Sequence, residues 1–186
     1  MLTLLLAALV CTCGATQDVG TWCDLHARGT IGGVTIHDRQ LFDVLDAHGH
    51  DVDVTTFACA SCQQAIKTGG FCEQHRIGFV QQRAYFSWLT YALAHGSTID
   101  TSRLTCSTCK KNAASFGWCD KDRLGIVGPT GFTDRAAYDR TVASLAIVKA
   151  ADQEAKRCSY CAVAIVTDTQ CPFCRISYKG GKRVLQ

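Results

Sequence analysis

A pattern of paired cysteines recurs four times along this 186-residue chain. In its regular form, two cysteines separated by two residues are followed, after nine residues, by a third cysteine, and a fourth polar side chain comes three positions later. The regular copies span Cys59–His75, Cys106–Asp122 and Cys158–Cys174, and a less regular copy spans Cys11–His26. The copies recur about every 50 residues, and self-similarity of this kind indicates a chain built from repeated structural units.

Each copy supplies four side chains of the kinds that bind Zn²⁺. A tetrahedral zinc site takes two closely spaced ligands from one backbone turn and two more from a second turn. All 13 cysteines belong to the four copies. The predicted ligands are Cys11, Cys13, Cys23 and His26; Cys59, Cys62, Cys72 and His75; Cys106, Cys109, Cys119 and Asp122; and Cys158, Cys161, Cys171 and Cys174. We therefore expect three to four Zn²⁺ ions.

Other uses of cysteine fit the pattern less well. A disulfide framework requires cysteines in pairs, whereas the fourth position holds cysteine, histidine or aspartate in different copies. An iron site of the rubredoxin kind needs four thiolates, which only the last copy offers. A thioredoxin-like dithiol uses a single C-x-x-C motif at the start of a helix, not four evenly spaced pairs.

The expected fold is a small, metal-stabilised α+β protein of tandem zinc-ribbon repeats. The nine-residue gap predicts a short β-hairpin between the two ligand knuckles, and a second hairpin and a helix follow each unit except the last. Units of this size bury too little apolar surface to be stable alone, which is why metals commonly support them. The predicted segments are 1–10, an apolar N-terminal segment; 11–50, 51–97 and 98–155, three zinc-ribbon units with a helix; and 156–186, a fourth unit with a basic tail.

Aromatic residues extend the match between units. Phe42, Phe86 and Tyr138 are predicted to occupy the same place in the three helices, with a shorter second hairpin in the second unit. The rings of Trp22, Phe71 and Trp118, each just before the third cysteine of its unit, are expected to cover the metal sites. The aromatic helix near residues 85–91 predicts either a central buried helix or a partner-binding surface.

The N-terminus is predicted to direct export. Leu2–Val10 is an uninterrupted apolar run, too short to span a bilayer but typical of the core of a secretory signal peptide. Cleavage after Ala15 and lipid attachment at Cys11 are both open, and a buried first strand is the structural alternative. We expect an exported or cell-envelope protein, with a cytoplasmic one as the alternative, no transmembrane span, and membrane attachment only through this end.

Two places depart from a purely structural interpretation. Asp122 stands where the other copies have histidine or cysteine, so the third site is either a weaker structural zinc or an open one with water as its fourth ligand. His48–Asp53 gathers two imidazoles and two carboxylates, which could bind an exchangeable zinc or copper ion, although a polar loop is the simpler interpretation.

Charge and motifs argue against nucleic acid and against ordinary catalysis. The formal charge is +3, but 13 thiolates (−13) and four Zn²⁺ (+8) would lower it by five, to about −2. The basic cluster near the end, Arg175 to Arg183, is too small for a convincing nucleic-acid footprint. No nucleophile elbow, Walker loop, H-E-x-x-H or dinucleotide fingerprint occurs, so we expect no enzyme.

Ligand segments such as Cys59–His75, with an aromatic residue before the third cysteine, resemble rubredoxin-like zinc ribbons, including double zinc-ribbon modules. The resemblance covers each ligand segment of about 17 residues. It implies structural zinc in the second and fourth units, and the irregular first pair and Asp122 depart from it. The first hypothesis for function is a non-enzymatic scaffold that binds a protein partner. The second is zinc or copper sequestration or delivery, and the third is rubredoxin-like electron transfer.

Overall fold

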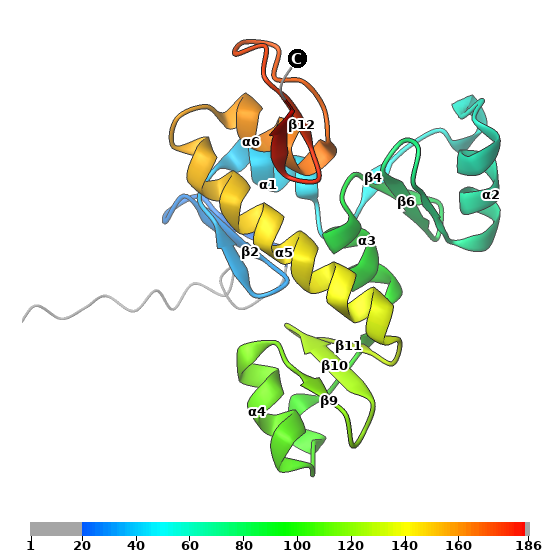
Figure 1. Ribbon diagram of the computed structural model, residues 1–186, viewed down its shortest axis with the longest axis vertical. Coiled ribbons are helices and arrows are strands. Elements are labelled where there is room, and N and C mark those ends of the chain that lie inside the picture. Colours follow the sequence, from blue (N-terminus) through cyan, green and yellow to red (C-terminus); the bar gives the residue numbers. More distant parts are fainter. Residues whose placement is uncertain (1–19, 185–186) are drawn as a thin grey trace, which may run out of the picture.

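The structure, a computed structural model, describes residues 20–184. The predicted apolar segment 1–10 and the predicted ligands Cys11 and Cys13 lie outside the described residues. Helix α5 (Arg135–Ala155) runs through the middle of the molecule, and three lobes are arranged around it (Figure 1). No helix among the described residues combines the length and the apolar character needed to cross a membrane.

The second and third units have the same succession of elements. The second contains β4 (His50–Asp51), the 3₁₀ turn η2 (Val54–Thr56), α2 (Ala60–Thr68), β5 (Phe71–Cys72), β6 (Ile77–Val80), β7 (Arg83–Tyr85) and α3 (Trp88–His95). The third contains β8 (Ser97–Thr98), η3 (Thr101–Arg103), α4 (Ser107–Ser115), β9 (Trp118–Cys119), β10 (Leu124–Val127), β11 (Thr130–Phe132) and α5. Their antiparallel sheets have matching strand orders, β4-β7-β6-β5 and β8-β11-β10-β9.

The first and fourth units show parts of the same plan. In the first, strands β1 (Trp22–Cys23), β2 (Arg28–Ile31) and β3 (Val34–Ile36) precede α1 (Arg39–Leu45). In the fourth, α6 (Ser159–Thr167) precedes the hairpin of β12 (Ser177–Lys179) and β13 (Lys182–Val184). The described residues end with this hairpin, at Val184.

The hairpin predicted between the two ligand pairs is wrong, because a helix occupies that segment in three units. In the second unit, α2 begins directly after Cys59 and ends at Gly69, which adopts the left-handed conformation with φ of 68°. The intervening residues are mostly good helix formers, including Gln, Ala and Lys, and glycine is the preferred residue just past a helix. Helices α4 and α6 occupy the same place in the third and fourth units.

The hairpin after the second ligand pair is present in all four units, and the shorter one predicted for the second unit is also wrong. Each hairpin turns through two residues that start six positions after the fourth ligand position: 32–33, 81–82, 128–129 and 180–181. The residue directly after the fourth ligand position has a positive φ in every unit; these residues are Ala27, Arg76, Arg123 and Arg175. The same two turns therefore recur at the same spacing in all four units.

A glycine–aromatic contact fixes each helix on its hairpin in the first three units. A Cβ atom at Gly29, Gly78 or Gly125 would lie 2.2–2.3 Å from the ring of the residue 13 positions later, so only glycine leaves room for that ring. The rings belong to Phe42, Tyr91 and Tyr138. The predicted equivalence of Phe86 with Phe42 and Tyr138 is thus wrong, and Tyr91 takes that place.

The aromatic residue before the third cysteine packs on the same helix ring. Ring centroids are 5.2 Å apart for Trp22 and Phe42, 5.3 Å for Phe71 and Tyr91, and 5.5 Å for Trp118 and Tyr138. Successive side chains of a strand point to opposite faces, so each ring faces the helix while the following cysteine faces the ligand cluster. The three rings that were expected to cover the metal sites therefore pack between the hairpin and the helix of their units.

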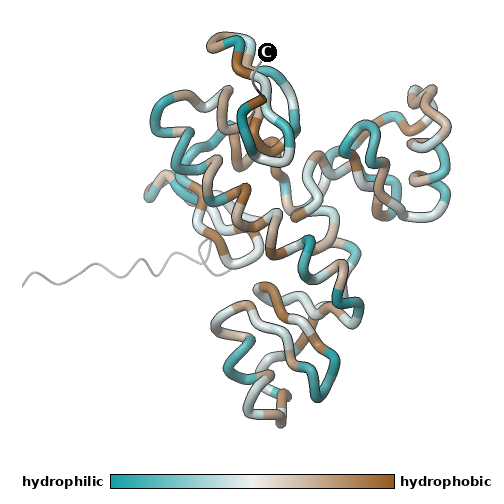
Figure 2. The backbone as a smooth tube through the Cα atoms, viewed as in Figure 1, coloured by the Kyte–Doolittle hydropathy of each residue, from teal (hydrophilic) through white to brown (hydrophobic). Residues whose placement is uncertain are grey.

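The main hydrophobic core lies between α1, α3, α5 and α6. It has 20 buried residues, whereas the ligand ends of the second and third units have separate clusters of five and three. Along α5, hydrophobic and hydrophilic stretches alternate (Figure 2), as expected for a helix that packs on several neighbours. Helix α3 contributes buried Leu89 and Ala92 to the main core, so the aromatic helix of the second unit is a central helix rather than an open surface.

Candidate metal centres

Three of the four predicted ligand sets converge in space. In each set, four ligand atoms lie within 4.8 Å of one another. The sets are Cys59, Cys62, Cys72 and His75 (the second cluster); Cys106, Cys109, Cys119 and Asp122 (the third cluster); and Cys158, Cys161, Cys171 and Cys174 (the fourth cluster). These are the metal-capable groups found among residues 20–184.

One local architecture builds all three clusters. The first cysteine is the N-cap of a helix, and the second lies in its first turn; α2, α4 and α6 are these ligand helices. The third cysteine lies at or beside a short strand, and the fourth ligand lies in the turn that follows it. A helix start supplies two ligands three residues apart on one face, and the tight turn of the hairpin supplies the other two.

The distances within the clusters fit a tetrahedral cation. In a tetrahedral site with Zn–S bonds of about 2.3 Å, two sulfurs lie about 3.8 Å apart. Sγ of Cys158 is 3.9 Å from Sγ of Cys171 and 3.8 Å from Sγ of Cys174, and Cys106 and Cys119 are separated by 3.9 Å. A disulfide bond would require about 2.0 Å, and the cysteines of the three clusters form none. In the second cluster, His75 Nδ1 lies 3.3 Å from Cys62 Sγ and 3.7 Å from Cys72 Sγ.

Burial follows the same order in every cluster: the first ligand is half-buried, the second and third are buried, and the fourth is exposed. Burial, then the neighbouring thiols, raises the pKa of Cys62 and of Cys161 to about 12. The backbone N–H of Cys62 at the start of α2 lowers the pKa of Cys59 to about 7. Buried thiols therefore resist ionisation beside one another, and a divalent cation is what would stabilise several thiolates together.

The third cluster differs by its carboxylate. Asp122 Oδ2 lies 3.0 Å from Cys109 Sγ and 3.7 Å from Cys119 Sγ. The hydrogen bond from the Cys109 thiol is the main cause of a lowered pKa of this carboxyl group. Asp122 thus takes the fourth ligand position of its cluster, as His75 and Cys174 do in theirs, and it is exposed to solvent.

In the first unit, two of the four predicted ligands, Cys23 and His26, lie among the described residues. Cys23 Sγ lies 3.2 Å from His26 Nδ1, and Cys23 is buried. The left-handed residue after His26, Ala27, repeats the knuckle turn of the other units. Cys11 and Cys13, the other two predicted ligands, lie outside the described residues.

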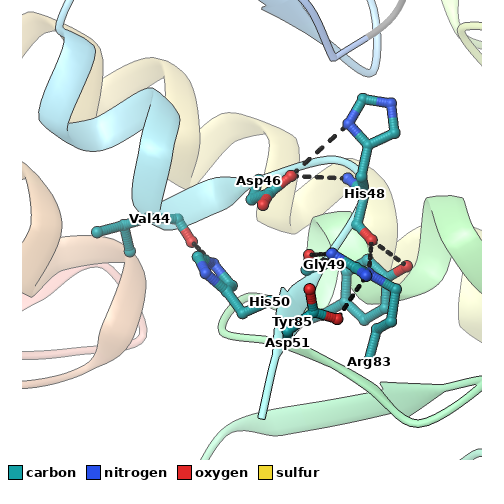
Figure 3. A network of polar contacts seen from close by, with 8 residues as sticks. All are labelled: Val44, Asp46, His48, Gly49, His50, Asp51, Arg83 and Tyr85. Atoms are coloured by element: carbon teal, nitrogen blue, oxygen red, sulfur yellow. Dashed lines mark hydrogen bonds and ion pairs between the residues drawn. The ribbon is translucent and has the colours of Figure 1, made fainter.

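The His48–Asp53 segment forms a polar network rather than a ligand cluster (Figure 3). His50 Nε2 lies 3.0 Å from the Val44 carbonyl oxygen, and Arg83 pairs with Asp51 at 2.6 Å. The side chain of His48 points away from that of His50 (Figure 3), and no group of three ligand atoms gathers here within the described residues. The geometry supports the polar-loop interpretation of this segment.

An ionic network that the sequence did not predict joins the second and fourth units to α5. Glu73, inside the second knuckle, accepts a hydrogen bond from Arg140 of α5 at 2.8 Å, and Arg76 contacts Glu73 at 3.1 Å. Arg76 also pairs with Asp168 at 3.3 Å. Asp168 ends the ligand helix α6 in the left-handed conformation and accepts from the N–H of Gly180. Positions so distant in sequence carry no local pattern that could reveal these pairs.

Comparison with known protein families, with curated proteins and with solved structures finds no match to the chain. The geometry by itself defines a mixed α+β protein in which three clusters of cysteine, histidine and aspartate could each hold a metal ion. Three such clusters agree in number with the lower end of the expected three to four ions.

Proposed function

We propose that this chain is a non-enzymatic zinc protein whose metal ions stabilise a scaffold of repeated units around α5. The observation that carries the proposal is the recurrence of one ligand geometry in three units, with the same order of burial and the same turn after the fourth ligand. Four sulfurs, or three sulfurs with a histidine or carboxylate, are ligand sets that Zn²⁺ accepts in structural sites.

The small size of the local cores supports a structural role for the ions. The ligand ends of the second and third units bury five and three residues, and two of these in each unit are cysteines. Apolar burial on this scale cannot fix a helix and a hairpin in one arrangement, whereas zinc binding contributes about 10–16 kcal/mol in finger-sized peptides. The ligand ends of these units, held rigid by zinc, would present exposed surface to a protein partner.

Metal content measured by native mass spectrometry tests this proposal. The purified chain should carry at least three Zn²⁺, and Cys62→Ser, Cys109→Ser and Cys161→Ser should each lose one ion. Ser107→Ala is the matched control, because Ser107 lies between two ligands of the third cluster without being one, and it should retain all ions. A folded, metal-free protein would overturn the proposal, and coloured protein with iron in the fourth cluster would favour electron transfer.

Metal delivery is the second candidate, and Asp122 favours it. An exposed carboxylate is a harder and more easily displaced ligand for zinc than a thiolate, so the third cluster would release its ion most readily. Competition with a chelator of graded affinity separates the two functions. Delivery requires one ion to leave while the second and fourth clusters stay occupied and the fold persists, whereas a pure scaffold loses ions only as it unfolds.

A further inference from the structure

Two aromatic rings stand exposed beside the fourth cluster. Tyr160 lies between the first two ligands of this cluster and Phe173 between the last two. Their ring centroids are 4.4 Å apart, and the side chains are 42% and 69% exposed. The other knuckles carry mostly polar residues at these positions, such as Gln74 and Lys121. The two rings pack on each other at the surface and form a small exposed aromatic patch.

Positive charge gathers in the same unit. Residues 156–186 contain six Lys and Arg residues and one acidic residue, out of 19 basic and 16 acidic residues in the chain, so residues 1–155 have 13 and 15. The six basic residues are all exposed: Lys156, Arg157, Arg175, Lys179, Lys182 and Arg183. The acidic residue, Asp168, is 16% exposed and pairs with Arg76. Four thiolates and one Zn²⁺ lower the charge of this segment by two, from +5 to about +3. The fourth unit therefore stays basic when loaded with metal, although the average charge of the whole chain argues against nucleic acid.

The two rings and two of the arginines belong to backbone segments that meet at the fourth cluster. Arg157 directly precedes Cys158, and Arg175 directly follows Cys174. The Sγ atoms of these two cysteines are 3.8 Å apart, and consecutive Cα atoms are separated by about 3.8 Å, so both arginines start close to the two knuckles that carry the rings. Lys179 and Lys182 face each other across the hairpin of β12 and β13.

We propose that the fourth unit binds single-stranded nucleic acid. Unpaired bases stack on Phe173 and Tyr160, and Arg157, Arg175 and the lysines of the hairpin bind phosphates. Stacking platforms inside a basic surface are the general means of single-strand recognition, and they tolerate many sequences because every base has a π-face. An acidic protein segment would match the charge but offers no bases to the rings. This inference goes beyond the scaffold role, and the proposed contacts involve no metal ligand.

Fluorescence anisotropy of a labelled 15-nucleotide oligouridylate tests the inference with the full-length, metal-loaded chain. The wild type should bind at 50 mM salt and more weakly at 200 mM, because phosphate contacts release counterions. Phe173→Ala should weaken binding about 10-fold, as expected for the loss of one base–aromatic stack. Phe173→Trp should retain binding, and Phe173→Leu should not. Leu25→Ala is the matched control, because Leu25 is the equivalent residue of the first unit and is 84% exposed.

A second pair of variants tests the charge. Arg157→Glu with Arg175→Glu should abolish binding at 200 mM salt, whereas Lys110→Glu with Lys111→Glu, two exposed lysines on α4, should lower affinity only slightly. Metal content and circular dichroism must equal those of the wild type for every variant compared. Absence of binding at 50 mM salt, equal effects of the two charge pairs, or competition by polyglutamate as strong as by unlabelled oligonucleotide would each overturn the proposal.

Discussion

Asp152 of α5 accepts two hydrogen bonds from one residue, His37, which directly follows β3. The backbone N–H of His37 lies 2.6 Å from Oδ1, and Nδ1 lies 2.9 Å from Oδ2. Asp152 is 4% exposed, so its carboxylate is a buried acceptor that ties the hairpin of the first unit to the last turns of the central helix. The neighbouring pair of Asp38, the N-cap of α1, and Ser159, at 2.6 Å, ties the start of α1 to α6.

Asp152→Ala should destabilise the protein by about 1–3 kcal/mol, because it removes a buried carboxylate and leaves the backbone N–H of His37 without its acceptor. Asp152→Asn should cost less, since the amide oxygen can still accept from that N–H. His37→Ala is the matched control: it removes the imidazole contact and keeps the backbone one. Urea unfolding of the metal-loaded proteins measures the difference, and a larger loss for His37→Ala than for Asp152→Ala would contradict this account.

Substitution of the glycines beneath the helix rings should also destabilise the protein. In Gly78→Ala, the new Cβ would lie 2.2 Å from the Tyr91 ring, so the helix α3 must move away from its hairpin. Overpacking of this kind costs about 1–3 kcal/mol, and the Gly125→Ala variant should behave alike because of Tyr138. Gly70→Ala is the control, because the closest atom to its added Cβ is the Thr68 hydroxyl at 3.0 Å, the end of a side chain that can turn away. Equal melting temperatures for Gly78→Ala and Gly70→Ala would contradict the prediction.

The ligand positions could be predicted from the sequence because metal chemistry constrains both residue type and spacing. Cysteine pairs at the start of a helix and at a hairpin turn must keep their separations, so the spacing of the cysteines predicts ligands such as Cys62, Cys109 and Cys161. The secondary structure between the two ligand pairs cannot be predicted in this way, because nine residues suit either a hairpin or a helix. In the second unit, Gly69 just past the end of α2 is the residue that favours a helix over a hairpin in this segment. Contacts such as Arg76–Asp168 join residues 92 positions apart and leave no sequence pattern.

Zinc binding at the second cluster should release protons near neutral pH. The pKa of Cys62 is raised to about 12, chiefly by burial, so this thiol is protonated at pH 7.5 and must lose its proton to bind zinc. Cys59, with its pKa lowered to about 7, is mostly ionised at that pH and contributes little. Affinity should therefore fall as pH is lowered, because more ligand protons must be displaced. Calorimetry in buffers of different ionisation enthalpy measures the release, and binding heats that do not depend on the buffer would contradict it.

The pair of Arg76 and Asp168 should couple the second and fourth units more strongly than surface pairs do. The side chains are 32% and 16% exposed, whereas Arg39 and Asp24, at the same 3.3 Å separation, are 56% and 90% exposed. A double-mutant cycle with alanine should give a coupling energy of about 0.5–1 kcal/mol for the first pair and nearly zero for the control pair. Equal coupling energies would show that Arg76 does not link the two units.

On metal removal, the clusters should lose their ions, and the surrounding segments should unfold, in a defined order. The third cluster has an exposed carboxylate ligand and only three buried core residues, so its ion should leave first under a chelator. The fourth cluster should resist longest, because Cys161 and Cys171 belong to the main core of 20 buried residues. Hydrogen exchange would then show early loss of protection in α4 and β9 while α5 and α6 remain protected.

Asp122→Cys should delay the loss of the ion from the third cluster by supplying a fourth thiolate, whereas Asp120→Cys, at an exposed non-ligand position of the same knuckle, should not. Simultaneous loss of protection throughout α4 and α6 would mean that the units unfold as one.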